Sequence, residues 1–290
     1  MAKFLRNYLL EVQEFVKGPF IPITLPFSID FDIQRNDESS TNIAAINIYN
    51  LAHTTRTKIR KDFTDQSELR RVILKAGYGD NLAVIFDGSM TRAWSHREGT
   101  NQTTHIESFD NGNAVVNAKF NQQFPENTPQ ETIAAAMVAS LKEFGVSTGA
   151  IGGSYSGFTS RGNAYGGNAV DLITQLSNGQ FFIDNGTAHI LANDEVIAGE
   201  PLIIDSASGL LNTPIREQFY FTFDMLFEPR LAIGQQIFLN SVTNPDSDFK
   251  GIMKVVGLQH KGMISYSVAG ECITTVKAKV GTFREVPVQA

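Results

Sequence analysis

Two aspartates spaced for acid–base chemistry lie in the first third of the chain. Asp30 and Asp32 alternate with apolar residues, so in a strand both carboxylates project from one face. Paired carboxylates can share a proton or hold a cation, as in a hydrolase. The same alternation places both side chains opposite an apolar face, where carboxylates are usually just solvated. We therefore expect an outward pair, with a hydrolase kept as an alternative.

The other candidates for chemistry lack the spacing that their chemistry needs. Five histidines are scattered without an HxH or HExxH pattern: His53, His96, His105, His189 and His260. In Gly-Gly-Ser154-Tyr-Ser156-Gly, a serine stands where a nucleophile elbow needs its second glycine. Cys272 is the only cysteine, which excludes an intrachain disulfide and favours a buried apolar role. We predict no cofactor, no metal and no enzymatic activity.

The composition limits the class of protein. The chain has 290 residues, 42% of them hydrophobic, which is enough for a sizeable core in one large or several small domains. Its 24 Lys and Arg against 30 Asp and Glu give a formal net charge of −6, without a basic cluster. Nucleic-acid binding needs concentrated positive charge and is not expected. A signal peptide and an apolar stretch of about 20 residues are both missing, which predicts synthesis in the cytoplasm and no membrane insertion.

Period-two alternation predicts a β-rich first third. The alternation is clearest over residues 25–33, and similar runs follow, separated by Gly, Asp and Asn. Further strands are expected at residues 43–49, 71–76, 82–86, 90–95 and 103–109. Turns are predicted at residues 77–80, 87–88 and 110–112, and a short helix at residues 54–63. Many short strands at this spacing indicate a barrel or a sandwich.

The middle third opens with a helix signal. Thr128 has the place of an N-cap, with Pro129 first in the helix and Glu131 completing a capping box. Apolar residues continue at helical spacing until Gly145, which supplies the stop. We predict a helix between these signals.

A loop, a second helix and a hairpin are predicted next. Residues 145–167 are rich in Gly and Ser and read as one long loop. Asn168 can cap a helix that ends at residues 178–179, and Asn185-Gly186 is typical of a two-residue hairpin turn. Strands return from about residue 199. We therefore predict three segments, a first tube-like β domain over residues 1–112, an α+β module over 113–198 and a second β domain over 199–290.

The last third contains turn motifs in a particular order. A Gly-Leu-x-x-x-Pro turn is followed by a Pro-x-Leu-x-x-Gly strand entry and a Val-x-x-x-His-x-Gly hairpin. The positions concerned are Gly209, Leu210, Pro214, Pro229, Leu231, Gly234, His260 and Gly262. This order resembles the baseplate hub proteins of contractile-tailed bacteriophages, the late control D or tail hub family, which is related in fold to the type VI secretion spike base. Motifs at residues 26–33, 48–51, 76–79, 86–88 and 167–172 extend the resemblance over nearly the whole chain.

The resemblance implies a mainly β fold with an inserted α+β module. It implies two tube-like β-barrel domains per chain, which form a pseudo-sixfold ring in a homotrimer. Such a hub would adapt the sixfold tail tube to the threefold central spike, form part of the DNA conduit and lie in the virion tail baseplate. The implied partners are the tail tube protein and the central spike protein, and further the tape measure protein and baseplate wedge components. His260 is expected to be a hydrogen-bonded structural residue. A carbohydrate-binding or adhesion module and a cell-wall hydrolase stay open as alternatives.

Overall fold

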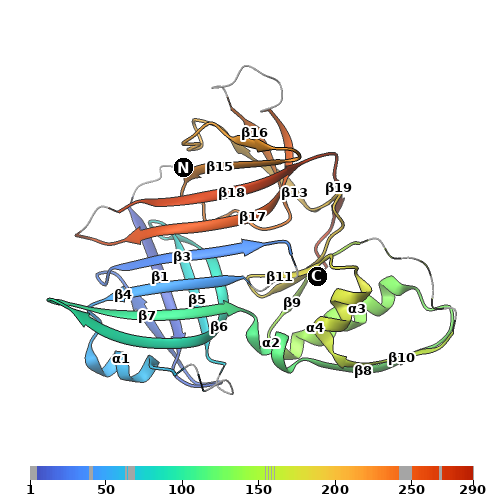
Figure 1. Ribbon diagram of the computed structural model, residues 1–290, viewed down its shortest axis with the longest axis horizontal. Helices are drawn as coiled ribbons and strands as arrows, with labels where there is room; N and C mark the ends of the chain where they lie inside the picture. The colour runs from blue at the N-terminus through green and yellow to red at the C-terminus, as the bar shows by residue number, and fades with distance from the viewer. Residues whose placement is uncertain are drawn as a thin grey trace.

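The computed structural model has a mainly β architecture (Figure 1). It describes residues 5–38, 42–62, 64, 69–153, 155, 157, 159, 161–241, 250–267 and 270–289. One sheet of fourteen strands dominates, and sheets of two and three strands lie beside it. Within these ranges, none of the helices has the length and apolarity to span a bilayer.

The first third of the chain supplies seven strands of the large sheet and one helix. They are β1 (Arg6–Gln13), β2 (Phe20–Thr24), β3 (Ile29–Asn36), β4 (Ile43–Tyr49), α1 (His53–Ile59), β5 (Arg71–Tyr78), β6 (Asn81–Glu98) and β7 (Asn101–Asp110). Alternate residues of β1, β3 and β4 are buried, as period-two patterning requires. These residues and Ile59 of α1 form a first hydrophobic core. The predicted strands are confirmed, with three corrections.

The prediction of a turn at Asp87-Gly88 is wrong, because β6 runs through both residues. A Cβ atom on Gly88 would lie 2.4 Å from the carbonyl oxygen of Phe109, so close strand approach explains this glycine. The first alternating strand begins at Ile29 instead of residue 25, since Pro26 has no N–H for a ladder. Helix α1 ends at Ile59, and Phe63, at the predicted end, lies outside the described residues.

The last third supplies the other seven strands. They are β13 (Glu195–Ile204), β14 (Ile215–Glu217), β15 (Tyr220–Leu226), β16 (Gln235–Asn240), β17 (Lys250–Ile264), β18 (Cys272–Val280) and β19 (Arg284–Val286). Their inward side chains form a second hydrophobic core. Phe227, Ile264 and Cys272 pack into the first core instead. Strands β17 and β18 therefore contribute to both cores, and the end of β17 and the start of β18 contribute to the first.

The two β regions repeat one strand arrangement. Unit 1 has the order β3-β4-β7-β6-β5 and unit 2 has the order β14-β15-β18-β17-β16, with every neighbour antiparallel. In unit 1, β4 pairs over seven residues with residues 103–109; in unit 2, β15 pairs over seven residues with residues 273–279. The long strand of each unit carries a bulge, after Met90 in β6 and after Val255 in β17. The chain thus contains the same five-strand unit twice.

The two units are joined edge to edge. The first half of β17 pairs with β16 of its own unit, and its second half, residues 257–264, pairs with β3 of unit 1. The result is one open sheet, with β2 and β14 at the ends of its strand order. Two tube-like β-barrel domains were expected; no sheet within the described residues is closed, and the second half of β17 pairs with β3 of the other unit. The division at residues 112 and 198 stays a prediction.

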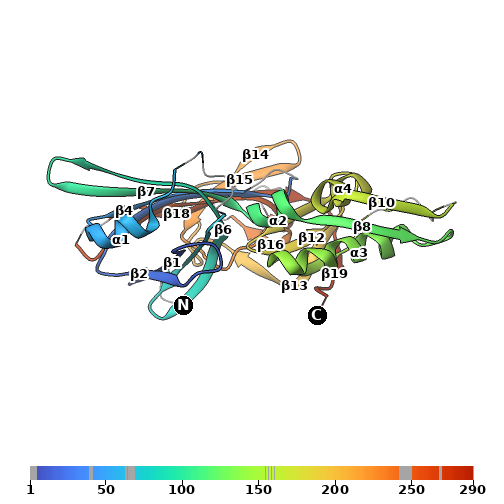
Figure 2. The ribbon, with the colours of Figure 1, turned by 90° about the horizontal axis from the view of Figure 1, so that it is seen from below.

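An α+β module lies at one end of the large sheet (Figure 2). Its elements are α2 (Gly112–Asn117), β8 (Lys119–Phe124), α3 (Gln130–Ser140), the 3-10 helix η1 (Leu141–Phe144), β9 (Ser147–Ile151), β10 (Asn163–Asn168), α4 (Ala169–Leu176), β11 (Phe181–Asp184) and β12 (Thr187–Ile190). A third hydrophobic core lies between its helices and its two small sheets.

Several local predictions in the module are confirmed. Gly145 ends η1 with φ 86°, and Asn168 caps α4 by accepting from the N–H groups of Val170 and Asp171. The Asn185-Gly186 turn has φ of 47° and 76°, as a type I′ hairpin requires.

Two predictions in the module are wrong. Thr128 does not cap α3, because the helix starts one residue later with Pro129 at the cap position, and the Thr128 hydroxyl donates to the Pro125 carbonyl oxygen at 2.7 Å. The predicted loop of residues 145–167 contains β9 and part of β10. Glycine-rich strands were not recognised there because they lack an alternating apolar pattern.

Candidate functional site

A buried polar cluster lies where both units meet the module. We call it the polar junction; its members are Arg35, Asn42, Asp110, Asp184, Glu228, His260 and Thr274, none more than 6% exposed. Arg35, on β3, donates to both carboxylate oxygens of Asp184, at 3.0 and 3.2 Å, and to the carbonyl oxygen of Leu231 at 3.0 Å. Asp184 ends β11 and Leu231 precedes β16, so one guanidinium ties together unit 1, the module and unit 2.

His260 holds the centre of the polar junction. Its Nε2 lies 3.0 Å from Nη2 of Arg35, and its Nδ1 lies 2.9 Å from Oγ1 of Thr274. Because a guanidinium can only donate, Nε2 accepts, and Nδ1 carries the proton and donates to Thr274. Burial, and secondly the charge of Arg35, hold the pKa of His260 well below its usual range. The imidazole is therefore neutral and fixed in one tautomer.

Asn42 and Asp110 extend the polar junction to the end of unit 1. The Asn42 amide donates to Asp110 at 3.1 Å and to the carbonyl oxygen of Ile183 at 3.0 Å. Burial, followed by the negative charge of Asp184, raises the pKa of Asp110 well above its usual range. These groups face one another in the interior, so the polar junction orients three parts of the chain and offers no open site for a substrate.

Two further buried charged residues, Glu195 and Lys254, lie where the module meets the second β region. The Glu195 carboxylate accepts from the backbone N–H of Gly153 at 2.7 Å and of Ala192 at 2.8 Å, and it pairs with Arg284. Lys254, 2% exposed, donates to the Ala192 carbonyl oxygen at 3.1 Å. Burial lowers the pKa of Lys254.

The sequence reasoning missed Arg35, Asp184, Glu195 and Lys254. A signal for Arg35 exists, because it shares the inward parity of Phe31 and Ile33 on β3. A charged residue at inward parity needs a buried partner. The identity of that partner, 149 residues away, cannot be read from spacing.

The eight motif positions lie at several places in unit 2. His260 belongs to the polar junction, and the carbonyl oxygen of Leu231 accepts a hydrogen bond from its Arg35. Gly234 precedes β16 with φ 80°, and its N–H donates to the Val255 carbonyl oxygen at 2.8 Å. Leu210 bridges to β15, and Pro214 directly precedes β14.

The two remaining glycines of the motif lie where an added Cβ atom would come close to neighbouring residues. Gly209 has φ 105°, which strains any other residue, and it lies with Pro229 in the wall of a pocket of about 580 Å³. A Cβ atom on Gly262 would stand 2.5 Å from the Cα atom of Cys272 across the β17–β18 pair.

Asp30 and Asp32 project outward from β3, as predicted. Asp30 accepts from the Asn47 amide at 2.9 Å and the Tyr49 hydroxyl at 3.1 Å, and Asp32 accepts from the Gln259 amide at 2.7 Å. Neither lines the pockets of about 880 and 580 Å³ that lie elsewhere in the molecule. The two carboxylates therefore belong to a set of side-chain hydrogen bonds across an open sheet face.

The remaining candidates have equally plain settings. Cys272 is buried as predicted, and burial raises the pKa of its thiol to about 12. Trp94 is half-buried within β6, with the Arg92 guanidinium 4.2 Å above its ring and His105 stacked at 4.9 Å, instead of lying in a loop as a sugar-stacking residue would. Ser154 and Ser156 lie outside the described residues.

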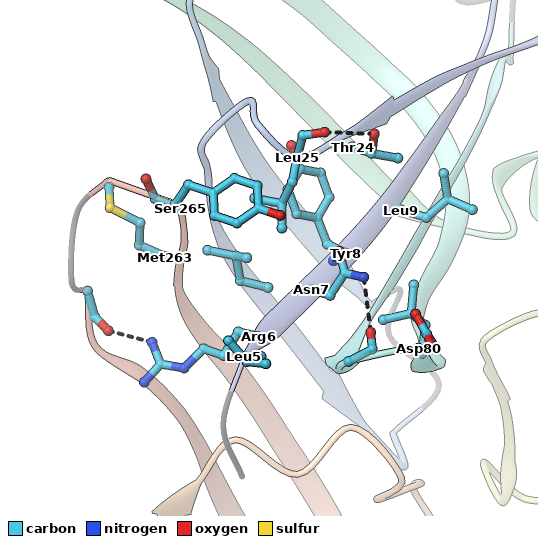
Figure 3. A pocket seen from close by; sticks show the side chains of 15 residues that line it. Leu5, Arg6, Asn7, Tyr8, Leu9, Thr24, Leu25, Asp80, Met263 and Ser265 are labelled. Atoms are coloured by element: carbon cyan, nitrogen blue, oxygen red, sulfur yellow. Dashed lines mark hydrogen bonds between the residues drawn. The ribbon is translucent and has the colours of Figure 1, made fainter.

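The larger pocket is a groove of about 880 Å³ between the start of β1 and the turn after β17 (Figure 3). Three of its polar side chains donate to backbone carbonyl oxygens. Arg6 donates to the Gly270 carbonyl oxygen, Asn7 to that of Gly79 at 3.0 Å and Tyr8 to that of Phe27 at 2.7 Å. The groove therefore presents bonded polar groups and a mainly apolar wall, without a nucleophile beside a base.

One comparison with known proteins identifies a family. A family model described as baseplate hub gp41 matches residues 11–250. No curated protein sequence matches the chain significantly.

Several solved structures share the fold. The 43 kDa tail protein of prophage MuSo2 from Shewanella oneidensis is 10% identical, with a TM-score of 0.58, over 94% of this chain and 96% of that one. A tail protein of Neisseria meningitidis is 9% identical, with a TM-score of 0.55, over 95% and 96%. The E. coli c3393 protein, a type VI secretion component described as structurally similar to T4 tail proteins gp27 and gp5, is 10% identical, with a TM-score of 0.56, over 91% and 76%.

Proposed function

The chain belongs to the baseplate hub gp41 family, and on this premise we propose that it is the structural hub of a phage tail, without chemistry of its own. Three copies would form a ring that adapts the sixfold tail tube to the threefold central spike. Its location would be the tail of the virion, and its partners the tube and spike proteins, with tape measure and wedge proteins nearby.

The internal duplication carries this proposal. Each chain contains two copies of one five-strand unit, joined side by side through β3 and β17. Three chains therefore present six similar units, which can match six tube subunits, while the ring as a whole keeps threefold symmetry for the spike. A chain with a single unit could not match both symmetries in this way.

The outward face of the large sheet suits a conduit for DNA. Across unit 1 and unit 2 it carries carboxylates, amides and lysines in alternation, including Asp30, Asp32, Gln259, Asp224 and Lys277. Several side chains on this face hydrogen-bond to one another. Gln259 donates to Asp32 at 2.7 Å, and the Thr275 hydroxyl donates to Asp224 at 2.6 Å. A mixed face of this kind gives passing phosphates no concentrated positive charge to bind.

A spike partner is supported by a further likeness. A Francisella PdpA–VgrG complex contains a chain that is 11% identical, with a TM-score of 0.54, over 98% of this chain and 54% of that one. This chain thus corresponds to about half of that longer protein. We propose that this hub holds the central spike.

Two measurements test the proposed function. Light scattering on the purified chain should give the mass of three chains, and the trimer should co-sediment with tube and spike proteins of the same phage. A chain that stays monomeric at all concentrations and joins neither protein would overturn the proposal.

A further inference from the structure

The groove of about 880 Å³ beside β1 combines an open backbone edge, an apolar floor and an accessible guanidinium. We propose that it binds an extended segment of another tail polypeptide, which pairs with Arg6 as an added strand and places an acidic side chain on its guanidinium. The inference rests on the proposed function and names the chemistry of a partner segment.

The open edge lies at the start of β1. Strand β2 pairs with β1 only over Leu9–Gln13, whereas β5 pairs with it over Arg6–Val12 on the other side. The N–H of Gly79 donates to the Leu5 carbonyl oxygen at 2.9 Å. Backbone groups alternate in direction along an antiparallel strand, so the N–H and C=O of Arg6 point away from β5. No strand in the described ranges pairs with Arg6 on that side.

The length of the open edge fixes where a segment can pair. Thr24, at the end of β2, already lies opposite Leu9. The N–H of Tyr8, which points to the same edge as that of Arg6, is bonded to Oδ1 of Asn7 at 2.8 Å. An added strand therefore continues the line of β2 beyond Thr24 and exchanges its backbone hydrogen bonds with Arg6.

The floor of the groove belongs to the first hydrophobic core. Tyr8 and Ile264, both 1% exposed, line the groove and are members of this core, and Leu25 packs against it. Two further lining residues, Leu5 and Tyr266, are 83% and 76% exposed. An apolar side chain of the added segment would bury against the core and cover exposed apolar surface, which favours binding.

The charged groups of the groove define the segment further. Arg6 uses Nη1 for the Gly270 carbonyl oxygen, and its Nε and Nη2 have no partner among the described residues. These two donors can bind one carboxylate through two parallel hydrogen bonds. Figure 3 shows Asp80 and Met263 on opposite sides of β1. The Asp80 carboxylate has no partner in the described part of the chain, so a basic side chain at that end completes the match.

Photo-cross-linking in assembled tails tests the proposal. The chain carries p-benzoylphenylalanine in place of Tyr266, which lines the groove and is exposed. Tails of the phage that contain this chain are purified and irradiated, and mass spectrometry identifies the linked peptides. We expect a link to a different tail protein, at a segment in which Asp or Glu stands beside apolar residues.

The variant Arg6→Ala tests the carboxylate contact. In the labelled chain it should lower the cross-linked fraction at least about fivefold, because the segment loses hydrogen bonds to a charged group. The matched control is Arg97→Ala. It removes a guanidinium outside the groove that also donates to one backbone carbonyl oxygen, that of Gly99 at 3.0 Å, and it should leave the fraction unchanged.

The outcomes separate this inference from the proposed function. Tails that contain the chain but give no cross-link would overturn the inference and leave the proposed function standing. The same holds for links only to a second copy or to the chain's own residues 1–4, and for equal losses in the two arginine variants. Absence of the chain from purified tails would overturn both.

Discussion

At the scale of single residues, the buried Arg35–Asp184 pair is the contact on which the arrangement of the three parts depends most. Asp184→Asn preserves size and leaves the Arg35 charge buried without its counter-ion. We expect the free energy of unfolding to fall by about 3–5 kcal/mol, measured by urea denaturation. The matched control is Asp62→Asn, which removes an exposed partner of Arg60 at 3.7 Å and should cost no more than about 0.5 kcal/mol. Similar losses in both variants would contradict the structural role of the polar junction.

The buried histidines predict a loss of stability in mild acid. Burial lowers the pKa of His189 to about 4, and its Nδ1 accepts from the N–H of Ala150 at 3.1 Å. Between pH of about 6.5 and 4, the unfolded chain binds a proton there and the folded chain does not, so stability is full above this window and falls as the pH drops through it. His260 acts in the same sense, and Asp110, with its raised pKa, acts in the opposite sense.

The variant His189→Asn isolates this effect, since its amide oxygen can replace Nδ1 as an acceptor. The free energy of unfolding of the unsubstituted chain should fall more steeply than that of the variant, by about 1 kcal/mol per pH unit between pH 6.5 and 5. Urea titrations at several pH values measure this slope. An identical slope in both proteins would show that His189 is not held neutral by burial.

At the scale of elements, β17 is the strand that both units share, and its glycines differ sharply in their surroundings. Gly262→Ala would force a methyl group to within 2.5 Å of the Cα atom of Cys272, and we expect a loss of about 1–3 kcal/mol. Gly251→Ala, in the same strand with nothing within 4 Å of the added atom, is the matched control and should change little. Thermal unfolding of the two variants measures the difference; a smaller loss for Gly262→Ala than for Gly251→Ala would mean that β17 and β18 do not approach so closely.

The elements could be predicted wherever their pattern is local. The alternation of β3 and β4, the Asn168 cap and the Asn185-Gly186 turn depend on neighbouring residues, and each is found as predicted. Gly88 was read as a turn because glycine serves both turns and close strand approach, and only the partner strand decides between them.

The contacts of the polar junction lay beyond sequence reasoning. Arg35 meets Asp184 and His260 from positions 149 and 225 residues away, and no period or motif connects them. Open sheet and closed barrel also share one strand pattern, because both consist of short alternating strands. Which of the two forms depends on the length of β17 and on the strand that pairs with its second half, which here is β3.

At the scale of the whole molecule, the duplicated unit accounts for the two β regions that lie on either side of the module in this chain. Each β region alone would expose unpaired backbone N–H and C=O groups at the edges of its sheet. The pairing of β3 with β17 satisfies these groups along one edge of each region.

Electron microscopy of the purified oligomer, viewed along its axis, tests the central claim most directly. The account predicts a ring around a central hole, with six similar lobes at low resolution that resolve into three chains of two units each. Single chains, or a ring in which every chain contributes one lobe, would contradict it.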